Sequence, residues 1–278
     1  METRVRLIAV AVLALPLARA APAKADGQAI PEIAEAFRHL YGFEFEDTHS
    51  VLNAYISTHP REALPYAVRS AGYLFYELDR LGILEGQFFT DDDRIVAKKK
   101  LDADPQVRIA LWKAIDETQS RALATLQAKP GDTGSLFAMS TAFGVASDYQ
   151  ALVEKRQIKS LSSTRQANEY AQRLLKLQPP FYDAYVSAGI SEYLLGSLPF
   201  FIRWFVHFDN VQGGKGQAVQ DLELVERQGL YLKPFARILL AIIYLREKKP
   251  ERSREFLQVL AREFPTNPLY ARELARLR

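Results

Sequence analysis

The four histidines are the first residues whose chemistry needs testing. His39, His49 and His59 follow one another at intervals of ten residues, whereas two histidines that bind a metal from one helix lie four residues apart. Three carboxylates near His49 could complete a ligand set, and they are Glu44, Glu46 and Asp47. A solvated helix turn explains this cluster better, because exposed turns commonly collect charged residues. We therefore expect no metal site.

Two further segments resemble ligand-binding loops only superficially. Residues 212–216 read Gln-Gly-Gly-Lys-Gly, but they lack the upstream glycine and the following Ser or Thr of a phosphate loop, so we expect an ordinary loop there. Residues 91–93 are three aspartates without the glycine of a calcium loop, and they suit the first turn of a helix. The chain also has no Gly-x-Ser-x-Gly motif and no cysteine. We expect no cofactor and no catalytic centre, with a helical-toroid enzyme as the least favoured alternative.

The charge balance argues against nucleic-acid binding. The chain has 36 basic and 33 acidic residues, but residues 1–25 hold four of the former and one of the latter. The remaining chain therefore has 32 of each, and it lacks the basic excess that a phosphate backbone attracts.

Residues 1–25 have the composition of a secretory signal peptide. Two arginines precede an apolar run from Leu7 to Leu17, which is too short to span a bilayer. Ala20 and Ala25 each end a small-x-small triplet of the kind that signal peptidase cleaves. We therefore expect export to the bacterial periplasm or secretion, with no transmembrane span after cleavage. A lipoprotein is excluded because no cysteine can carry the lipid.

Apolar residues recur at intervals of three and four, which predicts an all-α fold. One spacing occurs four times: a small residue, the positions four and seven further on, and a proline five later. A small residue lets two helices approach closely, the next two positions continue one buried face, and proline ends the helix. The sets are Thr48, Leu52, Tyr55 and Pro60; Thr118, Ala122, Thr125 and Pro130; Ala167, Ala171, Leu174 and Pro179; and Ser253, Leu257, Leu260 and Pro265.

This pattern resembles the second helix of a tetratricopeptide (TPR) repeat. The large, apolar, Gly, polar and Gly positions of the first helix are matched by Tyr185, Ala188, Gly189, Glu192 and Gly196. The resemblance covers most of residues 31–277 and extends to uncharacterised exported bacterial TPR proteins. It implies a TPR-like solenoid of helical hairpins in a single domain, residues 26–278, with insertions at about 80–101 and 197–216.

In this family the first helices line a concave surface, and here the phasing places mostly apolar residues there. They are Leu64, Val68, Ala71 and Phe75; Phe137, Ala138, Thr141 and Val145; Asp183, Val186, Ile190 and Leu194; and Phe235, Ile238, Ile242 and Leu245. The Lys, Arg and Asn residues with which peptide-binding members hold a C-terminal carboxylate are missing. An apolar concave surface is normally covered in water. Either neighbouring helices and the insertions fill the groove, or a helix or extended peptide occupies it.

The second insertion carries a cluster of large aromatic residues, among them Phe200, Phe201, Trp204 and Phe205. Such residues often anchor interfaces, although packing into the core is an equally simple role for them. We interpret the protein as a non-catalytic scaffold or adaptor of the bacterial cell envelope. It would bind a protein or peptide partner through these aromatic residues or through groove residues, above all Leu64, Val68, Phe75, Phe137, Val186, Ile190 and Leu194. The alternative is a carrier whose groove holds a lipid or acyl chain.

Overall fold

The computed structural model describes residues 28–85, 101–177, 180–197 and 214–277. Every regular element in these residues is a helix, which confirms the predicted all-α class. The first half contains α1 (Pro31–Tyr41), α2 (Phe45–Thr58), α3 (Leu64–Arg80), α6 (Pro105–Ala128), α7 (Thr133–Asp148) and a π-helical turn, η1 (Tyr149–Val153). The second half contains α8 (Gln157–Leu175), a 3-10 turn, η2 (Tyr182–Ala184), α9 (Tyr185–Ser197), α11 (Lys215–Gln228), α12 (Lys233–Arg246), α13 (Pro250–Glu263) and α14 (Pro268–Arg276).

The recurrent spacing found in the sequence forms a buried face on four helices. Its small residues in α2, α6, α8 and α13 are at most 4% exposed: Thr48, Thr118, Ala167 and Ser253. These four helices end at Thr58, Ala128, Leu175 and Glu263, each shortly before the proline of its set. In α2, α6 and α13 the end follows from the sequence, because the C-cap residue directly precedes the proline and is driven out of the α region. Helix α8 ends four residues before its proline, so this rule does not set its last residue.

Several helix starts are also fixed by local chemistry. Asp104, Asp132 and Asn267 precede α6, α7 and α14, and their side-chain oxygens accept hydrogen bonds from backbone N–H groups of the first turn. These bonds satisfy donors that have no partner within the helix. The cap at Asp132, which accepts from the N–H of Ser135 at 2.9 Å, sets the start of the helix that contributes most to the site described below.

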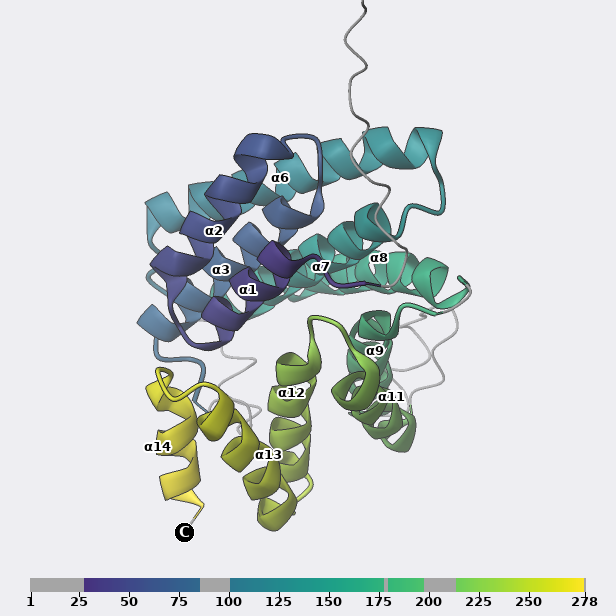
Figure 1. Cartoon of the computed structure of the whole chain (residues 1–278). Coiled ribbons are helices and arrows are strands. Elements are labelled where there is room, and N and C mark those ends of the chain that lie inside the picture. Colours follow the sequence, from purple (N-terminus) through teal and green to yellow (C-terminus); the bar gives the residue numbers. More distant parts are fainter. Residues whose placement is uncertain (1–27, 86–100, 178–179, 198–213, 278) are drawn as a thin grey trace, which may run out of the picture.

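Each helix contacts the next one along the chain, so that the helices pack in adjacent pairs (Figure 1). The pairs are α1 with α2, α3 with α6, α7 with α8, α9 with α11, and α12 with α13, while α14 packs on α13. Further contacts between α1 and α3, and between α3 and α7, join successive pairs.

The two ends of the described chain contact each other. The backbone N–H of Ile30 donates to the hydroxyl of Tyr231 at 2.7 Å, although 201 residues separate them. The side-chain amide of Asn267 donates to the carbonyl of Tyr41 at 2.9 Å. The rings of Phe37 and Tyr231 stack with their centroids 5.5 Å apart. Helix α1 therefore packs against segments from the other end of the chain, and the array curls back on itself (Figure 1).

Several predicted features fall outside the described residues. They are the signal peptide, residues 1–25, most of the first insertion, and the aromatic residues Phe200, Phe201, Trp204 and Phe205. Among the residues that are described, no helix is both long and apolar enough to cross a membrane.

One local expectation is wrong. Helix α11 begins at Lys215, so the last two residues of the segment 212–216 are helical, whereas the glycines predict a loop over the whole segment. Gly214 precedes this helix and donates its N–H to a carboxylate oxygen of Glu192 at 2.9 Å. The segment thus starts a helix that packs on α9, and this packing overrides the weak helix preference of glycine.

Candidate functional site

A partly open pocket lies among the first helices of the successive pairs. It contains about 840 Å³ of empty space, including part of its opening to solvent. Helices α1, α3, α7, α8 and α9, the turn η2 and the start of α12 form its walls. Nine residues of the predicted concave surface line it: Ala71, Phe75, Phe137, Thr141, Val145, Asp183, Val186, Ile190 and Phe235. Helix α1, which was not part of the predicted surface, covers one side with Phe37, Leu40 and Tyr41.

Helix α7 runs along the pocket. Phe137, Thr141, Val145 and Asp148 line it at intervals of three and four residues, so that they lie on one face of the helix. The eleven steps along the helix from the first to the last of these residues correspond to about 16 Å at 1.5 Å per residue. The pocket is therefore elongated, with a phenylalanine at one end of this face and a carboxyl group at the other.

Aromatic rings make up much of the wall. Phe137 stacks on Tyr231 with centroids 5.8 Å apart, and Phe37 stacks on the same tyrosine. Phe75 of α3 and Phe235 of α12 meet edge to face at 6.1 Å. These contacts bring helices that are distant in the sequence around one apolar space, which suits an apolar or aromatic group.

Asp183 lines the pocket as part of the structural frame. It is 1% exposed, and its carboxylate accepts the backbone N–H groups of Leu230 at 2.8 Å, Tyr231 at 3.1 Å and Leu232 at 2.7 Å. Burial raises the pKa of Asp183 above its usual value, and the three backbone bonds act in the opposite direction. A carboxylate with three donors fixes the loop before α12.

Gly229 is required beside this carboxylate. A Cβ atom at this position would lie 2.7 Å from the carbonyl oxygen of Val225 and 2.9 Å from Oδ1 of Asp183. A side chain would therefore push the loop away from the carboxylate that holds it.

Asp148 has a different environment. It is the last residue of α7, directly before the π-helical turn, and it is part-buried in the pocket wall. Within the described part of the chain its carboxyl group has neither a hydrogen bond nor an ion pair. Burial alone raises the pKa of Asp148 from 3.8 to about 7. This group can exchange a proton near neutral pH or pair with a cation that enters the pocket.

The hydroxyl groups near Asp148 bond to one another. The Ser147 hydroxyl lies 2.7 Å from Oγ1 of Thr164 and 3.0 Å from Oγ of Ser160, both on α8. It also donates to the carbonyl of Ser160 at 3.1 Å. This network joins α7 to α8 and, like the bonds at Asp183, is internal to the fold. It leaves the carboxyl group of Asp148 without a partner among the described residues.

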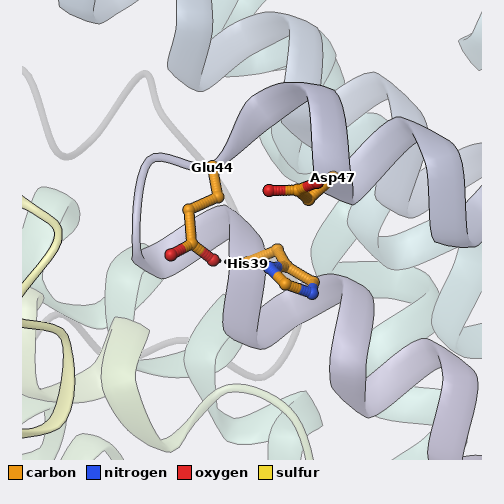
Figure 2. Close-up of side chains that lie close together, drawn as sticks. All are labelled: His39, Glu44 and Asp47. Atoms are coloured by element: carbon orange, nitrogen blue, oxygen red, sulfur yellow. Dashed lines mark hydrogen bonds and ion pairs between the residues drawn. The ribbon is translucent and has the colours of Figure 1, made fainter.

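A second cluster joins α1 to α2 (Figure 2). His39 Nδ1 lies 2.5 Å from a carboxylate oxygen of Glu44, and one possible ligand atom from each of His39, Glu44 and Asp47 lies within 4.8 Å of the others. The hydrogen bond from His39 is the main cause that lowers the pKa of Glu44. The guanidinium of Arg38 is 3.1 Å from His39 Nε2. Because the two closest atoms already bind each other beside a cation, the cluster fits a clamp on the turn between two helices, and we assign no metal to it.

His49 packs against α3, although the acidic residues near it in the sequence suggest an exposed turn. Its ring packs at 4.4 Å from that of Tyr73 and against Gly72, both on α3. The pKa of His49 is lowered to about 4, mainly by burial and to a smaller extent by the positive charge of Arg69. The expectation of a solvated turn is therefore wrong for His49, because α3 covers it.

The predicted partner-binding residues fall into three groups. Four are at most 4% exposed, namely Leu64, Val68, Phe137 and Val186. Phe75 and Ile190 are part-buried and line the pocket. Leu194 belongs to α9, but its side chain is not among those described, and the aromatic residues of the second insertion lie outside the described ranges.

Asp148 is not among the residues that the sequence predicts for the concave surface. The predicted concave series on α7 stops at Val145, and the same helical period continued by three residues reaches Asp148. A carboxyl group on the predicted pocket-lining face of the helix is the feature of the sequence that could have identified this residue.

Comparison with known protein families, with curated proteins and with solved structures found no match to this chain.

Proposed function

We propose that this chain is a non-catalytic binding protein that holds a small apolar ligand in the pocket along α7. The carrier function, which the sequence favours less than a scaffold or adaptor function, thus becomes the leading proposal. The observation that carries it is the partly open pocket, whose walls combine aromatic and aliphatic side chains with a minority of polar ones. Ligand sites are typically lined in this way.

Burial of the groove residues favours a small ligand over a docked helix. A helix laid along the whole groove would need contact with Leu64, Val68, Phe137 and Val186, and each of these is at most 4% exposed. The neighbouring helices, α1 among them, already cover this surface. The space that remains along Phe75 and Ile190 suits a small molecule better than a helix.

We further propose that the helical pairs form a TPR-like solenoid and that residues 1–25 direct the chain to the bacterial periplasm. Two observations support the solenoid: the four buried repeats of the second-helix pattern, and the contacts of α3 with both α1 and α7. The export proposal rests on the sequence of residues 1–25.

Filling the pocket tests the ligand proposal. Gly144 lines the pocket from α7, and a Cβ atom there would meet no atom of the described residues within 4 Å. Gly144→Leu should therefore place a side chain in the pocket without a clash. The probe is the neutral fluorophore N-phenyl-1-naphthylamine, whose emission rises in an apolar site. We expect saturable binding to the unmodified chain and a loss of about tenfold or more in affinity for the variant.

Gly216→Leu is the matched control. Gly216 is also a helical glycine with no described atom within 4 Å of a Cβ position, but it is exposed on α11 and outside the pocket. The control should bind the fluorophore like the unmodified chain. Equal affinities for all three proteins would refute binding in this pocket.

The scaffold or adaptor function is the second candidate, and a separate observation favours it. Ile158 on α8 is 86% exposed and Ile109 on α6 is 63% exposed, which is unusual for isoleucine. Leu161 lies one helical turn after Ile158 and is 39% exposed. A partner protein could bury these side chains. Ile109→Asp with Ile158→Asp should then abolish cross-linking to a specific partner in the cell-envelope fraction, and an unchanged cross-linking pattern would contradict it.

A further inference from the structure

We propose that the ligand of this pocket is an elongated apolar molecule that ends in an ammonium group, and that this group binds Asp148. The inference deepens the proposed function and rests on it. It assigns the pocket a chemical class of ligand, a hydrophobic amine, and it assigns Asp148 the role of its recognition group.

The charge of the pocket wall favours a cationic ligand. The titratable residues that line the pocket are Tyr41 from α1, Asp148 from α7 and Asp183 from η2. Helices α3, α8, α9 and α12 contribute uncharged side chains only, and no Lys, Arg or His is found among the described lining residues. The only formal charge that the described part of this wall can carry is therefore negative. A cationic ligand matches this wall, and an anionic ligand would meet repulsion without a compensating base.

The two carboxyl groups of the wall differ in their hydrogen-bond partners. Asp183 is occupied by the three backbone N–H groups at 2.7 to 3.1 Å, so it has little capacity left for a ligand. Asp148 has no partner among the described residues, and the neighbouring hydroxyls of Ser147 and Thr164 bind each other. An ionised carboxylate in an apolar wall is costly until a partner arrives. An ammonium group supplies both the opposite charge and the N–H donors.

The shape of the pocket suits an elongated ligand. Along α7 the wall runs for about 16 Å from Phe137 to Asp148, with Thr141 and Val145 between them. The lining ring of Phe137 lies at the end away from the carboxyl group, and the lining rings of Phe75 and Phe235 meet edge to face in the same wall. A molecule with one charged end and a long apolar body can therefore bury its body against the rings while its ammonium group reaches Asp148.

Three probes that share one alkyl chain isolate the charge. Decylamine, decanol and decanoate carry a positive, a neutral and a negative end at pH 8. Isothermal titration calorimetry would measure the affinity of each for the full chain. We expect decylamine to bind about tenfold more tightly than decanol, as for a hydrogen bond to a charged group, and decanoate to bind most weakly.

Asp148→Asn locates the effect. This variant keeps the size of the side chain and removes the charge, so decylamine should lose its advantage while decanol keeps its affinity. Asp116→Asn, on the exposed side of α6, is the control for the loss of one negative charge, and it should leave all three affinities unchanged. The Asn variant at 148 is not expected to unfold, since it replaces an unpartnered carboxyl group by a neutral one.

The outcomes separate this inference from the proposed function. Equal binding of decylamine and decanol, or an amine preference that survives in Asp148→Asn, would overturn the inference but leave an apolar binding site. Absence of binding by all three probes would overturn the inference together with the site on which it rests. An amine preference that is lost only in Asp148→Asn would establish both.

Discussion

Asp183 and Asp148 lie in the wall of one pocket, yet their surroundings differ in every respect that matters for function. Asp183 is held by three backbone donors and ties the loop before α12 to the turn η2. Asp148 has no partner in the described structure, and burial raises its pKa to about 7. The first carboxyl group stabilises the fold, whereas the second is maintained at a cost. Burial alone does not identify a functional group; lack of a partner is the more informative property.

The same contrast extends to the regions around the two residues. Near Asp183, Tyr231 connects the loop to Ile30 and stacks on Phe37 and Phe137. Near Asp148, the hydroxyls of α7 and α8 bond across the helix interface and leave the carboxyl group aside. One end of the pocket is therefore structural, and the other is available for a ligand.

The largest expected effect is the loss of Asp183. Asp183→Ala would leave three buried backbone N–H groups without an acceptor, and we expect it to lower the free energy of unfolding by about 3 to 5 kcal/mol. Urea unfolding followed by circular dichroism would measure this change. Asp116→Ala, at an exposed position, should change it by less than about 0.5 kcal/mol. A small effect at Asp183 would mean that the two carboxyl groups do not differ as described.

Asp148→Asn should act in the opposite direction and depend on pH. Because the pKa is raised to about 7 in the folded state, the folded protein holds this proton more firmly than the unfolded chain. The contribution of this group to stability is complete below about pH 4 and is lost as the pH rises towards 7. The Asn variant avoids this loss. We expect equal stability at pH 4 and a gain on the order of 2 to 4 kcal/mol at pH 8.

Urea titrations at the two pH values would measure the gain. A destabilised Asp148→Asn protein at pH 8 would show that the carboxylate has a partner in the folded protein, and it would remove the contrast with Asp183.

The smallest effect concerns the contact between the chain ends. Tyr231→Phe removes the hydroxyl that accepts the N–H of Ile30 at 2.7 Å but keeps the ring contacts. We expect a loss of about 1 kcal/mol in unfolding free energy, together with faster amide hydrogen exchange near Ile30. Tyr182→Phe is the control, since that hydroxyl makes no hydrogen bond with the described residues. Unchanged exchange at Ile30 would show that this link does not hold α1.

The local rules of the sequence determined the helices and their buried faces. The proline sets predicted where α2, α6 and α13 end, because proline constrains the residue before it whatever the tertiary structure is. The helical period also placed Phe75, Val145 and Ile190 on the surface that lines the pocket. These features depend on neighbours a few residues apart, and such spacings are visible in a sequence.

The tertiary structure alone decided which of these surfaces is open. Helix α1 covers part of the predicted groove, and its contacts with Tyr231 and Asn267 join residues about 200 positions or more apart, for which the sequence carries no periodic signal. The tertiary structure alone also decided the partners of Asp148 and Asp183. Whether a carboxyl group meets three N–H donors or none depends on where distant segments pack, and that decided which one the fold uses and which one it leaves free.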